Sequence, residues 1–233
     1  MTTYPRACLV TIGSELLKGT VLNTNAQFLA RGLTDLGFKV IGQSACSDEE
    51  TEIIHSLRDS LQKATCVILT GGLGPTPDDL TRQAVAKFLN VPLVLSPRQF
   101  SFIRRYYQNR GQKMPSLVKQ EALFPKTATP LFNRYGVALG FSVLCSNRLL
   151  VVLPGVPDEL ERMFDELVRP LLQRFFRPRA KDHSLVVKTA GISEPEVMER
   201  LGGNFLKNTF EFGIYPEIGE VTLRLYSDRL SVI

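Results

Sequence analysis

The sequence predicts an α/β fold of three layers, in which a mostly parallel sheet carries helices on both faces. A small α+β domain is expected to follow it. Two observations favour this fold class. Short apolar runs alternate with segments that have the spacing of amphipathic helices, which is the order expected of parallel strands joined by helices. In addition, the chain has 233 residues, enough for one well-buried domain and a smaller second one.

The first part of the chain supplies three strand–helix units. The pattern predicts strands at 7–12, 39–46 and 66–69. The last of these is an apolar run closed by glycines, which is typical of a fully buried strand. We expect helices at 23–36, after the capping-box spacing of 47–50, and at 79–89.

The remainder of the chain continues with mixed elements. We expect a helix from Ser96, a short helical stretch from Lys119, a hairpin of strands at 139–144 and 149–153, and a long helix after Pro157. A polar, proline-containing segment then has the composition of a linker. The expected domains are therefore 1–176 and 184–233, with a linker at 177–183; the second domain is either incomplete or completed by a partner.

One loop concentrates the candidate chemistry. Gly71, Gly72 and Gly74 follow the third strand directly, so backbone N–H groups can approach a ligand with no Cβ in the way. Thr76 and Pro77 then suit the start of a helix. A glycine loop leading into a helix N-terminus favours phosphate, although this loop has neither the Walker A ending nor the dinucleotide fingerprint.

Asp78 and Asp79 fall in the same expected first helical turn. Two carboxylates would repel a phosphate unless a divalent cation bridges them, and Mg²⁺ takes one or two carboxylates together with substrate phosphates. The sequence therefore predicts a metal at Asp78 and Asp79. Lys119 is the nearest cationic candidate for a departing phosphate, and an ordinary surface lysine is the alternative interpretation of that residue. One alternative stays open: Thr76 and Asp79 have the spacing of a capping box, which stabilises a helix without catalysis.

Further candidates lie where other strands end. Glu15 and Asp48 follow the first and second strands, at the edge where open α/β sheets bind ligands. An exposed loop acid is an equally good interpretation of Glu15. Asn133 precedes a second glycine-bracketed loop, from Gly136 to Gly140, which suits a second wall of a nucleotide site.

Composition excludes several classes of protein. The hydrophobic content of 44% and charged content of 22% are ordinary for a soluble protein, and the net charge of +5 shows no evident nucleic-acid stripe. Four separated cysteines indicate reduced thiols, and two histidines do not favour a histidine zinc site or a Ser-His-Asp triad. No apolar run has membrane length. We expect a cytoplasmic protein with neither a nucleic-acid nor a membrane partner.

Three motifs together resemble one known family. They are the loop from Thr70 to Thr81, the segment from Gly13 to Gly19 with Asn23 and Asn25, and the run from Leu153 to Pro157. Over about 9–176 the chain looks like the amino-terminal domain of CinA, the competence/damage-inducible protein, and the trailing unit resembles the small domain that follows. The wider superfamily is the molybdopterin-binding fold of MogA, MoaB and gephyrin.

The resemblance implies a metal-dependent nucleotide pyrophosphatase that splits ADP-ribose, or related dinucleotides such as FAD, into AMP and a phosphorylated fragment. It implies a divalent metal, Mg²⁺ or Co²⁺, with K⁺ as a further candidate, and a homodimer. The family's acids carry over to Asp48 and Asp79, with Asp78 beside the latter and Glu15 in the first loop.

Two motifs depart from the family pattern. The family's Gly-Thr-Ala-Pro-Gly appears here as Gly136-Val137-Ala138-Leu139-Gly140, and its Lys-Gln-Ala appears as Gln120-Glu121-Ala122, with Lys119 displaced by one position.

Two alternatives to the hydrolase stay open. One is a molybdopterin-binding protein that activates a pterin by adenylyl transfer, and the other is a CinA-like protein that binds nucleotide without catalysis.

Overall fold

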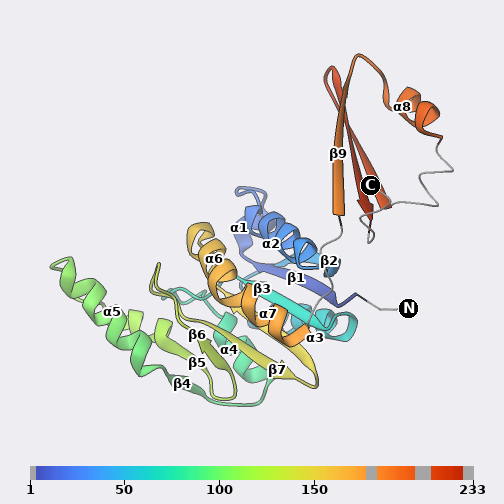
Figure 1. Ribbon diagram of the computed structural model, residues 1–233. Coiled ribbons are helices and arrows are strands. Elements are labelled where there is room, and N and C mark those ends of the chain that lie inside the picture. Colours follow the sequence, from blue (N-terminus) through green and yellow to red (C-terminus); the bar gives the residue numbers. More distant parts are fainter. Residues whose placement is uncertain (1–3, 177–182, 203–210, 228–233) are drawn as a thin grey trace. The chain divides into compact units, whose positions relative to one another are not determined.

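The computed structural model describes residues 4–176, 183–202 and 211–227. The chain divides into two compact units, Met1–Pro178 and Arg179–Ile233, each with its own main sheet (Figure 1). The predicted linker, apart from His183, lies outside the described residues. In the parts of the chain that are described, no helix has the length and apolarity needed to cross a membrane.

Unit 1 is built on a six-stranded sheet with the order β2-β1-β3-β8-β7-β6. The first four strands are parallel neighbours, whereas β7 and β6 are joined through antiparallel pairs. The α/β class and the mostly parallel sheet are therefore confirmed. The bounds are β1 (Arg6–Ile12), β2 (Lys39–Cys46), β3 (Cys66–Thr70), β6 (Thr129–Leu131), β7 (Gly140–Cys145) and β8 (Arg148–Leu153).

Helices cover both faces of this sheet, which makes the three predicted layers. Alternate residues of β1 serve the two cores, as the period of two in a strand requires: Leu9 packs in one and Val10 in the other. The core around Leu9 includes side chains of α2 (Thr24–Asp35), α6 (Pro157–Met163) and α7 (Arg169–Phe176). The core around Val10 includes side chains of α3 (Glu50–Lys63) and α4 (Thr81–Phe88).

A small lobe lies between α4 and β6 in the chain. Its elements are β4 (Leu93–Leu95), α5 (Pro97–Asn109), the 3-10 helix η1 (Ser116–Ala122) and β5 (Leu123–Pro125). Ile103, Val118 and Ala122 form its own buried cluster. In Figure 1 the helix α5 lies at the margin of unit 1, away from α2 and α3.

In its described residues, unit 2 is a three-stranded antiparallel sheet with one helix. The strand order is β10-β11-β9, and the alternating Leu223 and Leu225 of β11 are buried together with Met198 of the helix. The predicted α+β character of this segment is confirmed. The elements are β9 (His183–Ala190), α8 (Glu194–Leu201), β10 (Glu211–Glu217) and β11 (Glu220–Ser227).

Two helices differ from their predicted form. α3 begins at Glu50 after the N-cap residue Glu49, whose side chain accepts no hydrogen bond from the helix, so the predicted capping box of 47–50 does not form. The long helix after Pro157 is interrupted by a π-helical turn, η2 (Phe164–Val168), before α7 continues it. A third helix, α4, begins later than predicted, at Thr81, and this difference is described with the glycine loop below.

Candidate functional site

The carboxyl ends of four parallel strands meet at one edge of the sheet, and the candidate residues follow them. β1 leads into Gly13, β2 into Asp48, β3 into Gly71 and β8 into Gly155. A hollow of about 120 Å³ opens at this edge, lined in part by Glu15, Asn23, Asn25, Gly71 and Gly155. Open α/β sheets bind their ligands at this edge.

The glycine loop has a backbone that only glycine fits at its first two positions. Gly71 has φ of 103° and Gly72 has φ of 65°. A Cβ on Gly71 would lie 2.2 Å from the carbonyl oxygen of Ile12, and one on Gly72 would lie 2.2 Å from Oγ1 of Thr81. Within the described residues, the N–H groups of Gly72, Leu73 and Gly74 donate to no protein acceptor. An anion that reached these N–H groups would therefore displace no protein hydrogen bond.

Asp79 closes a turn of its own just after this loop. Its Oδ2 accepts the N–H of Thr76 at 2.9 Å and also the Thr76 hydroxyl, while the Asp79 N–H donates to the Thr76 carbonyl oxygen at 3.1 Å. One half of a capping box is present, because the acid accepts the N–H of the residue three positions before it, but the Thr76 hydroxyl donates to Asp79 instead of accepting a backbone N–H. The prediction that a helix opens at Thr76 and Pro77 is wrong, because this closed turn precedes α4, which begins at Thr81.

Asp78 and Asp79 form an adjacent pair of carboxylates at the loop. Asp78 is exposed, and hydrogen bonding at the turn holds its pKa below the ordinary value, so it is ionised at neutral pH. No group of three or more His, Cys, Asp or Glu side chains in the described ranges is arranged to hold a metal ion. The pair fits a Mg²⁺ ion that completes its shell with water and substrate phosphates, but not a closed structural site.

Asp48 and Glu15 lie on the same edge and differ in how they are held. The Asp48 Oδ2 accepts both the N–H and the hydroxyl of Ser14 at 2.8 Å, which fixes the carboxylate against α1 (Ser14–Leu17). Glu15 is exposed and lines the hollow. Nearby, Asn25 donates to the Gly155 carbonyl oxygen at 2.7 Å, while its buried Oδ1 has no partner in the described chain.

The second predicted loop is organised by Asn133, which is fully buried. Its Oδ1 accepts the N–H groups of Tyr135 and Gly136, and its Nδ2 donates to Oε2 of Glu159 at 2.6 Å. A Cβ on Gly136 would lie 2.1 Å from a Glu159 carboxylate oxygen, so this loop is built against α6. Gly140 does not join the site, because it is the first residue of β7 and pairs with Leu131.

Sequence reasoning missed two charged residues buried behind the glycine loop. Arg82 is fully buried and donates from Nη1 to the Gly74 carbonyl oxygen at 3.1 Å and from Nη2 to the Leu73 carbonyl oxygen. Glu121 is 3% exposed, and its Oε2 has no partner in the described chain. Burial raises the pKa of Glu121 to about 7, with Asp79 adding to the rise and Arg82 opposing it. The signal for Glu121 was its place in the altered Gln120-Glu121-Ala122 motif.

Lys119 lies apart from this buried group. It is exposed on η1, whereas the next residue, Gln120, donates from Nε2 to the Pro75 carbonyl oxygen. α5 makes a similar contact, because Gln99 donates to the Val137 carbonyl oxygen at 2.8 Å. The lobe therefore touches both glycine-bracketed loops.

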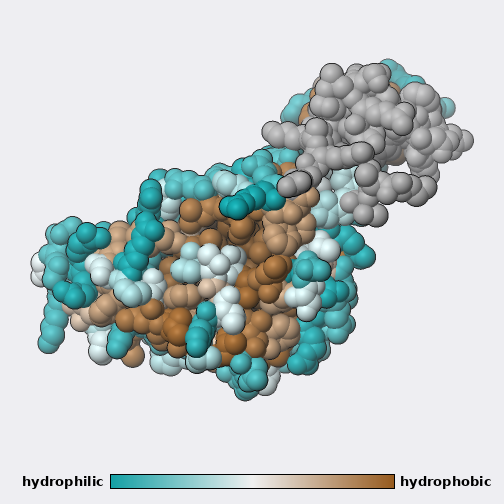
Figure 2. All heavy atoms as spheres, turned by 60° about the horizontal axis from the view of Figure 1, so that its bottom comes forward, coloured by the Kyte–Doolittle hydropathy of each residue, from teal (hydrophilic) through white to brown (hydrophobic). Residues whose placement is uncertain are grey.

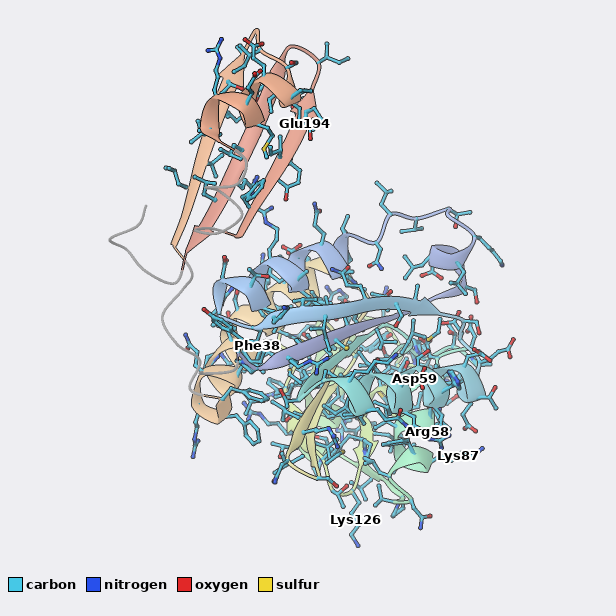
Figure 3. All side chains as sticks on the ribbon, turned by 90° about the vertical axis from the view of Figure 1, so that its right-hand side faces the viewer. Phe38, Arg58, Asp59, Lys87, Lys126 and Glu194 are labelled. Atoms are coloured by element: carbon cyan, nitrogen blue, oxygen red, sulfur yellow. The ribbon has the colours of Figure 1, made fainter. Side chains whose placement is uncertain are left out.

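The lobe, together with β6 and the residues that follow it up to Arg134, is strongly basic. Between 96 and 134 there are eight Lys and Arg residues and one acid, the buried Glu121, although the whole chain carries only +5. All eight cations are exposed and none forms an ion pair within the described residues; Lys126, for example, projects away from the ribbon (Figure 3). Hydrophilic residues also lie along the end of unit 1 that contains α5 (Figure 2). The excess of basic over acidic residues is thus concentrated in this part of the chain.

Comparison with known proteins matches most of unit 1 to one family. Residues 8–174 match the family described as "Probable molybdopterin binding domain". The chain is 35% identical over 222 residues to a CinA-like protein of Kosmotoga olearia, an alignment that covers 94% of this chain and 53% of that protein. The chain thus spans about half the length of the curated relatives it matches.

Solved structures give the same placement. The protein CinA of Thermoplasma acidophilum is 31% identical, with a TM-score of 0.67 over 72% of this chain and 98% of that one. The molybdopterin biosynthesis enzyme MoaB of Thermus thermophilus is 16% identical, with a TM-score of 0.50 over 76% of this chain and 99% of that one, which shows a shared fold alone. The chain therefore belongs to the molybdopterin-binding domain family, as a CinA-like protein.

Proposed function

We propose that unit 1 is a metal-dependent nucleotide pyrophosphatase that hydrolyses ADP-ribose, or a related dinucleotide such as FAD, to AMP and a phosphorylated fragment. The observation that carries the proposal is the pairing of three unoccupied loop N–H groups with the Asp78 and Asp79 carboxylates at the ligand edge of the sheet. Amides suit phosphate oxygens and carboxylates suit a cation that accompanies them.

In this mechanism the protein binds the diphosphate and supplies a base. The N–H groups of Gly72, Leu73 and Gly74 hold phosphate oxygens and stabilise the charge that develops during attack. Water adds to one phosphorus while the bridging P–O bond breaks, so ADP-ribose gives AMP and ribose 5-phosphate. Asp48, whose Oδ2 accepts two hydrogen bonds from Ser14, would accept the proton of the attacking water. Glu15, in the hollow, contacts the rest of the nucleotide.

Asp78 and Asp79 are the residues that would hold a divalent cation, Mg²⁺ or Co²⁺. When bound, such an ion neutralises the diphosphate and lowers the pKa of a bound water. The Asp79 carboxylate also closes the turn with Thr76, so its orientation is fixed before any ion arrives. Preorganisation of this kind reduces the entropy lost on binding.

The direct test is release of AMP from ADP-ribose, FAD and NAD, measured by chromatography with Mg²⁺, Co²⁺ or no divalent ion. We expect AMP only with metal, and a loss of about a hundredfold or more in Asp79→Asn. The asparagine oxygen still accepts from Thr76, so the turn persists while the charge is removed. Asp165→Asn, an exposed carboxylate of η2 paired with Arg169, is the matched control. A folded protein that releases no AMP under any condition contradicts the proposal.

The basic lobe predicts that reaction with an anionic substrate depends on salt. Arg104→Glu with Arg105→Glu should lower kcat/KM about tenfold at low ionic strength, because the lobe raises the local concentration of anions. The difference in kcat/KM between variant and wild type should vanish near ~0.5 M salt, where the Debye screening length is on the order of a few Å. The value of kcat should be unchanged at every salt concentration. Arg31→Glu with Arg58→Glu, exposed on α2 and α3, is the matched control. Equal salt curves for all three proteins would contradict steering by the lobe.

A second candidate is binding of a pterin, which the family description supports. The same fold serves in molybdopterin biosynthesis in the Thermus thermophilus enzyme, at an identity that supports fold alone. Binding of molybdopterin without release of AMP from any dinucleotide would favour this candidate over hydrolysis. Affinity for ADP-ribose without turnover would instead favour a nucleotide-binding protein. A homodimer remains our expectation for either function.

A further inference from the structure

The carbonyl groups of the glycine loop are all held from one side, by the first two residues of α4. Thr81 donates from Oγ1 to the Gly71 carbonyl oxygen at 2.7 Å and from its N–H to the Gly72 carbonyl oxygen at 3.2 Å. Arg82 donates to the carbonyl oxygens of Leu73 and Gly74. Four consecutive carbonyl groups therefore point toward the N-terminus of α4.

This arrangement fixes the direction of the amides. In a trans peptide the C=O of one residue and the N–H of the next point in opposite directions, and the described chain has no cis peptide. The N–H groups of Gly72, Leu73 and Gly74 must then point away from α4. The run ends at Pro75, which has no N–H. Thr81 and Arg82 thus set which side of the loop can accept an anion.

Arg82 also places a charge directly behind these amides. Its guanidinium is fully buried, and burial lowers its pKa to about 10 while Glu121 and Asp79 raise it, so it is charged at neutral pH. A buried charge acts through a medium less polarisable than water, so its potential at the loop is stronger than that of an exposed arginine. No other cation donates to the loop within the described residues.

We propose that Arg82 is a positioning residue for diphosphate binding: from behind the loop it turns the Leu73 and Gly74 carbonyl groups inward, and so directs the loop amides to a diphosphate that it never touches. Thr81 does the same for Gly71 and Gly72. This inference rests on the proposed function and deepens it, because it names the diphosphate as the group that the loop binds and assigns a role to a residue outside the contact surface.

The test is binding of inorganic pyrophosphate in the presence of Mg²⁺, measured by calorimetry. Arg82→Met should weaken binding about tenfold to a hundredfold, the cost of losing charge-assisted hydrogen bonds that hold the loop. Arg82→Lys should recover part of the loss, because it keeps the charge without reaching both carbonyl oxygens. Arg58→Met, on an exposed arginine of α3 (Figure 3), should bind as the wild type does.

Two further measurements separate positioning from a general loss of structure. Thr81→Val is similar in shape and removes only the hydroxyl bond to Gly71, so binding should weaken several-fold while the protein stays folded, with a lower but still cooperative melting transition. In wild type, pyrophosphate should shift the amide NMR signals of Gly72, Leu73 and Gly74. If Arg82→Met does not fold, Arg82→Lys and Thr81→Val decide the question by the same affinities.

The possible results are distinguishable. Wild-type affinity in a folded Arg82→Met, or in both Arg82→Lys and Thr81→Val, overturns the inference, and so does a wild type that binds no pyrophosphate. Affinity that follows Arg82 while ADP-ribose is not hydrolysed supports the inference and contradicts the proposed function. If both hold, the variants should raise KM for ADP-ribose more than they lower kcat, because the lost interaction is present before the chemical step.

Discussion

Gly71→Ala is expected to destabilise unit 1 by about 3–5 kcal/mol, more than any other alanine substitution in the glycine loop. Two costs combine at this position. The backbone has φ of 103°, which only glycine adopts readily, and the added Cβ would lie 2.2 Å from the Ile12 carbonyl oxygen. That oxygen belongs to the last residue of β1, a strand paired on both sides, so neither partner can move aside without disturbing the sheet.

The matched control is Gly19→Ala. Gly19 has φ of 68°, but a Cβ there meets nothing within 4 Å, so only the conformational cost of about 1–2 kcal/mol applies. Thermal unfolding should therefore show a drop of roughly 6–20 °C for Gly71→Ala and a clearly smaller drop for Gly19→Ala. Equal shifts for the two variants would mean that the contact between Gly71 and Ile12 relaxes at no cost.

Two strands of the sheet, β1 and β3, could be predicted with little ambiguity because they are apolar runs followed directly by glycine. Cys66 to Leu69 are all fully buried, and a strand buried on both faces carries little ambiguity of pattern. The start of α4 could not be predicted in this way. Thr76 and Pro77 have the residue types of a helix start, but the Asp79 carboxylate pairs with Thr76 and closes an isolated turn first. The hydrogen bond between Thr76 and Asp79, three residues apart, outweighs the helix-start preference of Thr76 and Pro77.

The residues of the candidate site also fall into two groups: those that the sequence could place, and those that only the packing of the fold brings together. Residues that follow strands, such as Asp48 and Gly71, could be placed at one edge because parallel strands share their carboxyl edge. Arg82, Glu121 and Glu159 come from α4, η1 and α6, and only the packing of these elements brings their charges together. No spacing in the sequence encodes that proximity, which is why a fully buried arginine looked like an ordinary helical position.

Glu121→Gln is expected to make the protein more stable by about 3 kcal/mol at pH 8 and to leave it nearly unchanged at pH 4.5. The pKa of Glu121 is about 7 in the folded protein, against an ordinary value of 4.5. Between these values the folded state binds more protons than the unfolded state, so wild-type stability falls as pH rises from 4.5 to 7 and then levels off. Glutamine has the shape of the protonated acid and no charge to desolvate, so the variant should escape that fall.

The measurement is the free energy of unfolding from urea titrations at several values of pH between 4.5 and 8. Glu161→Gln, an exposed glutamate of α6, is the matched control and should follow the wild-type curve throughout. Parallel curves for wild type and Glu121→Gln would show that the Glu121 carboxylate stays charged in the folded protein, paired with Arg82. The predicted divergence above pH 5 would instead show that the folded chain keeps a proton beside the glycine loop near neutral pH, a consequence of the acid in its Gln120-Glu121-Ala122 motif.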